Sequence, residues 1–216
     1  MNFSLRPFII IPLAGILITS CNKDNDTAPG TPAATYSNYS ALAVGNYWIY
    51  ENFRVDSSGN ATSTNTFDSC YVEKDTVISG RTFYKVFRPT ILEDFIYLSD
   101  SLHYIIRPGN YIVFSSEDFT TVFSSRYTFG SNGDTLYFTE WKMTDSPVNT
   151  TVPAGTFLTL NSKETYYMSP MMSMSGAIRY INHRYAAGVG LISETLPFFA
   201  SDPMYTERRL VRYYVQ

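Results

Sequence analysis

The chain has 216 residues, of which 44% are hydrophobic, 16% aromatic and 16% charged, and its 16 basic and 19 acidic side chains give a formal net charge of -3. This apolar content is enough to bury a core, which excludes a disordered protein, and the lack of a basic excess argues against a nucleic-acid-binding protein. The 2 cysteines and 2 histidines are too few for most zinc sites or for a disulfide framework. We therefore expect neither a metal nor a cofactor.

Residues 1–20 have the pattern of a secretory signal peptide. A single basic residue, Arg6, precedes an apolar run from Phe8 to Ile18. A helix of about eleven residues spans roughly half of the ~30 Å hydrocarbon core of a bilayer, so this segment is too short to cross a membrane. A basic start, a short apolar run and small residues before a cleavage point are typical of a signal that is removed from the mature protein.

The end of this signal, Ile18-Thr19-Ser20-Cys21, resembles the lipobox of bacterial lipoproteins. In that family a signal peptidase cuts before a cysteine whose sulfur carries a diacylglycerol with palmitate-type chains. The resemblance implies that Cys21 is lipidated and that the membrane is a partner through this anchor. Two acyl chains hold a protein stably on a bilayer, whereas one gives only marginal binding. The alternative is an ordinary signal peptide followed by a cysteine.

Residues 21–40 predict a flexible tether, because they are polar and rich in Pro, Ala and Thr and cannot bury enough apolar surface to fold. Lys23 and the acidic residues Asp24 and Asp26 resemble the export signal of surface-exposed lipoproteins of Bacteroidota. The resemblance implies a lipid-anchored protein of the outer membrane that faces the cell surface. The alternative is an anchor that faces the periplasm.

Residues 41–216 are expected to form a single β-rich domain. Aromatic and β-branched residues alternate with turn clusters, and Pro108-Gly109 and Asn132-Gly133 mark two hairpins in which glycine supplies the positive φ. The best helical candidate is a short piece at 116–125. Strands are expected over residues 47–55, 66–73, 76–78, 82–87, 102–107, 110–114, 127–129, 135–138, 156–167, 177–184, 190–195 and 207–215.

The fold class predicted from this pattern is all-β. Consecutive strands with short turns favour a single antiparallel meander, which forms either a curved sheet that closes into an open up-and-down barrel or a two-sheet sandwich. Tyr47 and Ile49 alternate with Trp48 and Tyr50, so both faces of this strand carry apolar residues. We therefore expect a strongly curved sheet that is covered on both sides.

Three motifs together are similar to a group of uncharacterised exported lipoproteins of Bacteroidota. They are GNYWIY at 45–50, VPAGTF at 152–157 and GVGLI at 188–192. The resemblance covers most of the mature chain and implies one exported β-domain. It supplies no catalytic residue, and the sequence contains no motif of an esterase, kinase, metalloprotease or EF-hand. We expect a protein that is not an enzyme.

Methionine, cysteine and histidine side chains are the candidates for metal binding or nucleophilic and acid-base chemistry. The segment Met168 to Met174 holds four of the seven methionines, which suits either a Cu(I) site or a flexible contact loop. Cys70 is expected to be a buried, inert thiol. His103 and His183 are expected to be strand residues with one hydrogen bond each rather than general bases.

Acidic and aromatic residues are further candidates for catalysis, modification or ligand binding. The acid pairs at 93–94 and 117–118 are expected to be solvated, although paired carboxylates also occur in glycosidases. Asp-Ser and Asp-Thr steps, most clearly Asp26-Thr27, resemble O-glycosylation acceptors of Bacteroidota. The remaining aromatic candidates are expected mainly in the core, with a minority placed to contact a ligand; they are Trp48, Trp141, Tyr166, Tyr167, Tyr213 and Tyr214.

The function favoured by these observations is a non-catalytic binding module on the cell envelope, with a glycan or an envelope protein as its partner. The alternative is a carrier or sensor of an apolar ligand inside a half-open β-barrel. An enzyme of unrecognised type is the third hypothesis. An exposed aromatic surface is expected for the first, an apolar cavity of several hundred Å³ for the second and converging polar groups in a cleft for the third.

Overall fold

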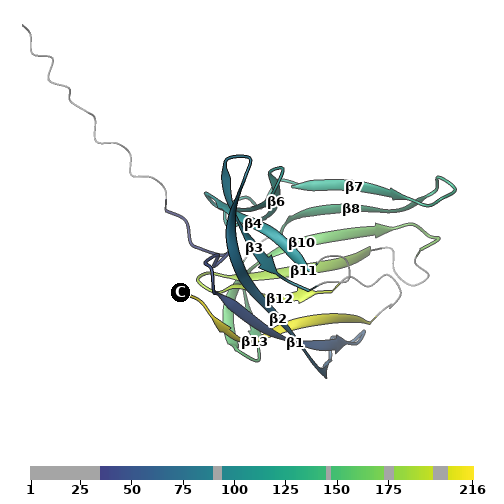
Figure 1. Ribbon diagram of the computed structural model, residues 1–216. Helices are drawn as coiled ribbons and strands as arrows, with labels where there is room; N and C mark the ends of the chain where they lie inside the picture. The colour runs from purple at the N-terminus through teal and green to yellow at the C-terminus, as the bar shows by residue number, and fades with distance from the viewer. Residues whose placement is uncertain (1–34, 90–93, 145–146, 173–177, 197–203) are drawn as a thin grey trace, which may run out of the picture. The chain divides into compact units, whose positions relative to one another are not determined.

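The computed structural model describes residues 35–216 except 90–93, 145–146, 173–177 and 197–203 (Figure 1). The described residues form thirteen β-strands and no helix, and every strand pair is antiparallel. Consequently no described helix is long and apolar enough to cross a membrane. The predicted all-β class and the antiparallel arrangement are confirmed.

The strands account for most of the described residues. They are β1 (Tyr47–Val55), β2 (Ala61–Ile78), β3 (Arg81–Phe87), β4 (Phe95–Ser101), β5 (Tyr104–Arg107), β6 (Tyr111–Ser115), β7 (Ser124–Phe129), β8 (Thr135–Met143), β9 (Val148–Val152), β10 (Gly155–Met168), β11 (Ile178–Ala186), β12 (Gly190–Thr195) and β13 (Tyr205–Tyr214).

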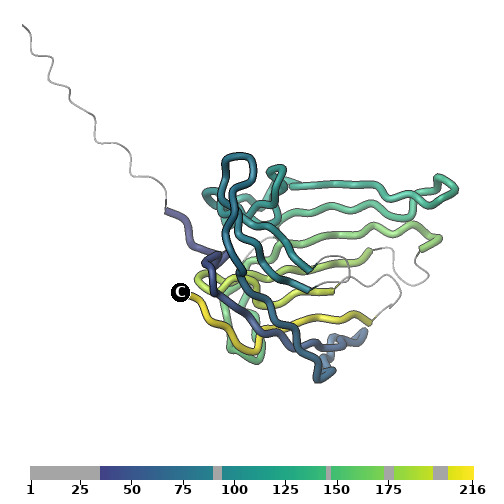
Figure 2. Tube along the Cα trace, viewed as in Figure 1, coloured from purple at the N-terminus to yellow at the C-terminus, as the bar shows by residue number. Residues whose placement is uncertain are grey.

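The strands form one sheet in the order β6-β5-β4-β3-β2-β1-β13-β12-β11-β10-β8-β7, with β9 paired to the first half of β10. The chain therefore starts in the middle of the sheet at β1. It runs outward to β6, crosses to β7 at the opposite end and returns strand by strand until β13 pairs with β1. The sheet curls on itself (Figures 1 and 2), so that β6 comes close to β8 and β10. The result is a nearly closed barrel with a seam.

Side chains of β10 and β8 bridge this seam. The hydroxyl of Ser162 on β10 donates to the carbonyl of Val113 on β6 at 2.5 Å and accepts a hydrogen bond from Trp141 Nε1 at 2.6 Å. Beside it, the backbone N–H of Ser115 lies 3.3 Å from the sulfur of Met143 on β8. Side chains of β8 and β10 thus bind backbone groups of β6 at a place where no strand ladder joins them.

The interior of the barrel contains two apolar clusters. The first is built around Trp48 and Tyr50, which are 5% and 2% exposed. The second surrounds Phe114 and Tyr185, whose ring centroids lie 4.7 Å apart. Burial of these large rings provides the main force that curls the sheet, because each removes about 150–250 Å² from water.

The first and third sequence motifs meet in this interior. Trp48 Nε1 donates to the carbonyl of Val189 at 2.7 Å, and the Tyr50 hydroxyl donates to the carbonyl of Leu191 at 2.6 Å. Between these carbonyls lies Gly190, with φ +95, where an added Cβ would be 3.3 Å from the carbonyl oxygen of Ser40. Two buried ring donors therefore need the backbone that this glycine permits.

The outer face carries a row of aromatic residues in register across five neighbouring strands. Tyr47 pairs with Tyr214 and with Tyr71, and further along the row Tyr71 pairs with Phe87 and Phe87 with Phe95. The rings of Tyr71 and Phe87 stack at 5.0 Å. Tyr71 and Tyr214 are 39% and 51% exposed. The expectation that both faces are covered is thus wrong here, since cross-strand ring contacts explain the outer aromatics.

Two strands and one turn region differ from the sequence-based expectations. β4 and β9 were not predicted, and residues 116–125 contain no helix but bends that lead into β7 at Ser124. In this region the Asp118 carboxylate accepts hydrogen bonds from the backbone N–H groups of Thr120 and Thr121 at 3.1 and 3.0 Å. Such side-chain capping of local N–H groups competes with helix formation. The hairpins at Gly109 and Gly133 are confirmed, with φ of 83 and 85.

Candidate functional site

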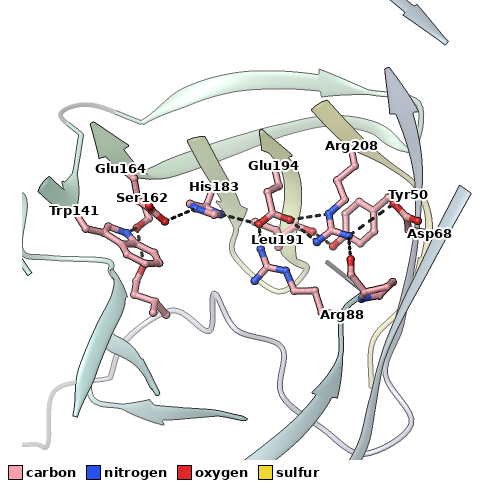
Figure 3. A network of polar contacts seen from close by, with 12 residues as sticks. Tyr50, Asp68, Arg88, Trp141, Ser162, Glu164, His183, Leu191, Glu194 and Arg208 are labelled. Carbon is pink, nitrogen blue, oxygen red and sulfur yellow. Dashed lines mark hydrogen bonds and ion pairs between the residues drawn. The ribbon is translucent and has the colours of Figure 1, made fainter. Parts of the chain in front are cut away.

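A row of polar and charged residues crosses the inside of the barrel in strand register (Figure 3). Ser162 of β10 pairs with His183 of β11, His183 with Glu194 of β12, Glu194 with Arg208 of β13, and Arg208 with Asn52 of β1. All five are buried, and none exceeds 8% exposure. Because directly paired residues in a sheet share a face, the strand register alone brings these side chains together.

Glu194 is the centre of this row. Its carboxylate accepts hydrogen bonds from Arg208 Nε at 2.7 Å and pairs with Arg208 Nη2 at 2.6 Å. Arg88, the residue after β3, pairs with the other carboxylate oxygen. Burial raises the pKa of Glu194, but the charges of Arg88 and Arg208 outweigh it and hold the pKa well below its usual value. Glu194 is therefore ionised in the folded protein.

His183 connects this centre to a second carboxylate. Its Nδ1 lies 3.1 Å from Glu194 and its Nε2 lies 3.5 Å from Glu164 on β10. Burial lowers the pKa of His183, yet the contacts with both glutamates outweigh burial and raise the pKa above its usual value. The Glu164 carboxylate also accepts a hydrogen bond from the Tyr166 hydroxyl at 2.8 Å. The imidazole is thus held between two carboxylates and favours its protonated form.

The far end of the row reaches β2. Asp68 accepts a hydrogen bond from Asn52 Nδ2 at 2.9 Å and lies 3.8 Å from Arg208 Nη1. Arg208 Nη1 also donates to the carbonyl of Pro89 at 3.2 Å. With His183 protonated, the three cations of this network balance its three carboxylates. We call the set Arg88, Arg208, His183, Glu164, Glu194 and Asp68 the interior charge network.

The geometry of the interior charge network favours a structural role. Its central groups are buried, and paired buried charges fix the register of the strands that carry them rather than meet a substrate. Within the described ranges, no group of three or more His, Cys, Asp or Glu side chains is placed to hold a metal ion. Sequence patterns alone do not reveal this network, because its members come from six separate segments.

A small cavity lies beside the network. It has a volume of about 40 Å³ and is lined mostly by apolar side chains, with Arg88 and Cys70 among its walls. A water molecule needs about 10–15 Å³ on this measure, whereas pockets for small molecules have about 300–1,000 Å³. The cavity is therefore too small for the apolar ligand that the carrier hypothesis requires.

Cys70 is buried on β2, as expected, at 4% exposure. Burial raises the pKa of its thiol to about 11, and the opposing charges of Arg208 and Arg88 only partly offset this effect. A thiol that stays protonated at neutral pH is a poor nucleophile. The prediction of an inert cysteine is supported by this environment.

A much larger groove opens at the seam. It has a volume of about 670 Å³ and is lined by residues of β4, β5, β6, β7 and β8 and of the adjoining turns. Five aromatic side chains and two arginines contribute to its walls, and the lining includes no carboxylate among the described residues. The lining residues are Phe95, Ile96, Tyr97, Arg107, Pro108, Tyr111, Ile112, Val113, Phe123, Ser124, Arg126 and Trp141. We call this feature the seam groove.

Several contacts fix the walls of the seam groove. Trp141 stacks on His183 with 5.5 Å between centroids and an interplanar angle of 16°. The Tyr111 ring packs over Gly109, where an added Cβ would lie 2.8 Å from it, and Tyr111 is 66% exposed. Phe123 meets Tyr104 edge to face at 6.4 Å. One wall thus rests on the interior charge network, and another on the Pro-Gly turn.

The other residues singled out from the sequence are dispersed. Cys21 and Asp26 lie outside the described residues. Trp48 is buried in the core and donates to a backbone carbonyl. His103 makes the one side-chain hydrogen bond expected, with the Ser115 hydroxyl at 2.9 Å, and also contacts the rings of Tyr36 and Tyr104. His183 instead lies between two carboxylates, where a single hydrogen bond was expected.

The methionine segment divides between buried and exposed positions within the described residues. Met168 is buried at the end of β10, Met171 is 68% exposed, and Met174 lies outside the described residues. Of the acid pairs, Glu93 also lies outside, Asp94 and Glu117 are exposed, and Asp118 caps a turn. The tyrosine pair of β10 divides between the two faces of the sheet: Tyr166 binds Glu164 of the interior charge network, and Tyr167 binds Glu140.

Two solved structures are similar to this chain. No protein-family model and no curated protein matches the chain. A candidate lipoprotein from Parabacteroides distasonis ATCC 8503 aligns with a TM-score of 0.42 at 12% identity, over 84% of this chain and 100% of that chain. A candidate exported protein with a YmcC-like fold from Bacteroides fragilis NCTC 9343 aligns with a TM-score of 0.37 at 11% identity, over 83% of this chain and 100% of that chain. These matches assign the chain to no family.

Proposed function

We propose that this protein is a lipid-anchored, non-catalytic binding module of the bacterial cell envelope, and that it holds a segment of a protein partner in the seam groove. The observation that carries this proposal is the position and lining of the groove. It is about 670 Å³ in volume, it is lined by five aromatic residues and two arginines, and it lies where the two ends of the sheet meet without a strand ladder.

The composition of the groove supports binding rather than catalysis. Tyr, Trp and Arg are the residue types that most often carry binding energy at interfaces, and the groove volume falls in the range of ligand sites. Among the described residues, the only histidine between two carboxylates is His183, which lies buried beneath Trp141 and not in the groove lining. The lining itself lacks a paired acid and base.

The walls of the groove favour a polypeptide over a glycan. Two of them are the strands β6 and β7, which are the first and last members of the sheet. The edge of a sheet presents backbone N–H and C=O groups at the spacing of another polypeptide chain. Sugar rings gain from open aromatic faces, whereas Trp141 already stacks on His183 and the ring of Phe95 is covered by Lys85 Nζ at 3.7 Å.

The proposed membrane anchor rests on the lipobox at residues 18–21. An apolar run of this length is a signal rather than a membrane span, and a diacylated cysteine gives stable attachment. We propose the outer membrane as the location, with the surface-facing side favoured by the acidic residues behind Cys21. Fractionation of cells that express the Cys21→Ala variant tests the anchor. Release of the variant from the membrane fraction is expected, and continued sedimentation with membranes contradicts the lipobox interpretation.

Partner capture with groove variants tests the binding function. The full chain, a Tyr111→Ala variant in the groove and a Leu158→Ala variant on an exposed site of β10 are each incubated with solubilised envelope proteins and with a glycan array. Leu158 is 61% exposed, close to the 66% of Tyr111, so it is a matched control. We expect one envelope protein to be retained by the native chain and by Leu158→Ala but lost by Tyr111→Ala.

Two results would contradict the proposal. Equal capture of proteins by all three chains would mean that the groove does not bind the partner. Glycan binding that Tyr111→Ala abolishes, in the absence of a captured protein, would place a sugar ligand in the groove instead.

A further inference from the structure

We propose that the partner segment binds as an added β-strand along the free edge of β7, with acidic side chains directed to Arg126 in the seam groove. This inference rests on the proposed function, because it specifies how the groove recognises a polypeptide. It follows from three observations: the difference between the two edges of the sheet, the lack of protection on β7, and the two chemically distinct faces of β7.

The two edges of the sheet differ in how their backbone groups are satisfied. At β6 the carbonyl of Val113 accepts the Ser162 hydroxyl, and the N–H of Ser115 meets the sulfur of Met143. β6 is also buried over its last three residues. In the part of the chain that the structure describes, β7 pairs only with β8 and its other edge meets no strand. The open edge of the barrel is therefore β7.

β7 lacks most of the devices that normally protect an edge strand. Exposed edges usually carry charged side chains, prolines or strong bulges that prevent another chain from pairing, and β7 has one charged residue, Arg126, and no proline. β7 reads Ser-Ser-Arg-Tyr-Thr-Phe, and its single register shift lies between its last two residues. Tyr127 and Phe129 are 59% and 60% exposed on this strand. β9 also pairs with a single strand, but its three central residues are polar, so β7 combines a free edge with exposed aromatic side chains.

The outer face of β7 begins a row of apolar residues. Tyr127 pairs with Phe138 of β8, Phe138 with Tyr167 of β10, and Tyr167 with Ile178 of β11. Ring centroids lie 4.6 Å apart for Tyr127 and Phe138 and 5.9 Å apart for Phe138 and Tyr167. A strand added to β7 places every second side chain beside Tyr127 and Phe129, which extends this row by one position. Apolar residues are favoured there.

The inner face of β7 favours acidic rather than apolar side chains on the added strand. Ser124 and Arg126 line the seam groove together with Arg107, and no described lining residue is acidic. The alternate side chains of an added strand point toward this face. Carboxylates at these positions complement the exposed guanidinium group of Arg126, whereas lysines are repelled. The segment that fits is therefore an extended peptide in which apolar and acidic residues alternate.

A peptide array tests this chemistry on the full chain. The probes are synthetic peptides of about nine residues in which valine alternates with glutamate, threonine or lysine. We expect the glutamate series to bind and the lysine series not to bind. The Arg126→Glu variant is expected to reverse this preference, while Arg54→Glu, at an exposed position on β1, leaves it unchanged. Equal binding of all series, or no binding of any, would overturn the proposal.

Backbone methylation separates strand addition from contacts made by side chains alone. The valine-glutamate peptide is prepared in two forms, with N-methyl groups on the amides of either its valines or its glutamates, so that each form blocks one edge. An added strand uses one edge only, so one form is expected to lose at least about tenfold in affinity while the other keeps it. Equal effects of the two forms would exclude strand addition. If the two forms act equally but Tyr111→Ala still abolishes partner capture, then the groove binds the partner without strand addition.

Discussion

The imidazole Nδ1 of His183 lies 3.1 Å from the carboxylate of Glu194 in the interior of the barrel, between strands β11 and β12. This contact joins two halves of one network. On one side of it are Glu164 and the Trp141 ring that lines the seam groove, and on the other are Arg88 and Arg208. The support of the groove and the stability of the barrel therefore depend on the same buried charges.

Glu194→Gln is expected to destabilise the protein strongly. The substitution leaves two buried guanidinium groups without their carboxylate, and breaking a buried ion pair costs about 3–5 kcal/mol. Glu73→Gln removes the partner of Lys85 on the surface, where the N···O distance is 2.8 Å, and should cost far less, because solvent screens exposed ion pairs. Urea unfolding of both variants measures the difference. Similar losses for the two variants would show that the interior charge network does not hold the strands together.

The free energy of unfolding should fall as the pH rises from about 6.5, the ordinary pKa of histidine. His183 has a pKa above its usual value in the folded protein, so its stabilising contribution is complete below about pH 6.5 and is lost as the pH passes through the raised pKa. His183→Gln should flatten this decline, while His103→Gln, which loses a hydrogen bond to Ser115 and ring contacts with Tyr36 and Tyr104 but no carboxylate partner, should retain it. An unchanged alkaline decline in His183→Gln would contradict the protonated state assigned to this residue.

At acidic pH, the free energy of unfolding should instead fall as the pH is lowered. Glu194 and Glu164 have pKa values below their usual value in the folded protein, since the arginines in one case and His183 in the other outweigh the effect of burial. Their contribution is present above about pH 4.5 and is lost as the pH falls through the lowered values. Thermal unfolding between pH 2 and pH 6 checks this, and Glu194→Gln should show a shallower acid loss than the native chain. An acid loss as steep as that of the native chain would contradict the ionised state of Glu194.

Ser162→Ala should loosen the seam. The substitution leaves the Trp141 N–H and the Val113 carbonyl without their bridging hydroxyl, which costs about 1–3 kcal/mol for buried groups. Ser99→Ala is a buried control, because the Ser99 hydroxyl makes only a 3.4 Å contact with a backbone carbonyl. Hydrogen exchange should increase in β6 for Ser162→Ala and stay unchanged for Ser99→Ala. Unchanged exchange in both variants would remove Ser162 as the bridge.

Cys70 should resist alkylation in the folded protein. Its pKa of about 11 keeps the thiol protonated at neutral pH, and its side chain is buried. In a Cys21→Ala background it is the only thiol of the chain. Iodoacetamide should label it only when the protein is unfolded in denaturant, and rapid labelling of the native protein would contradict its burial.

The sequence predicts the strands better than it predicts the charge network. The hairpins at Gly109 and Gly133 carry their own turn chemistry and were found directly, whereas β9 reads Val-Asn-Thr-Thr-Val and shows no strong apolar alternation. Glu194 and Arg208 look like ordinary charged strand residues, since their contact depends on the pairing register of β12 with β13. The groove depends on the curl of the whole sheet, so no local pattern marks its lining.

A photo-crosslinking measurement in cells tests the binding function of the seam groove most directly. In the full chain, a benzophenone amino acid replaces Tyr111 in the groove or Leu158 at an exposed position of β10, and adducts formed on irradiation are identified by mass. We expect an adduct with one envelope protein from position 111 and none from position 158. No adduct from position 111, or the same adducts from both positions, would contradict the claim that the groove holds a protein partner.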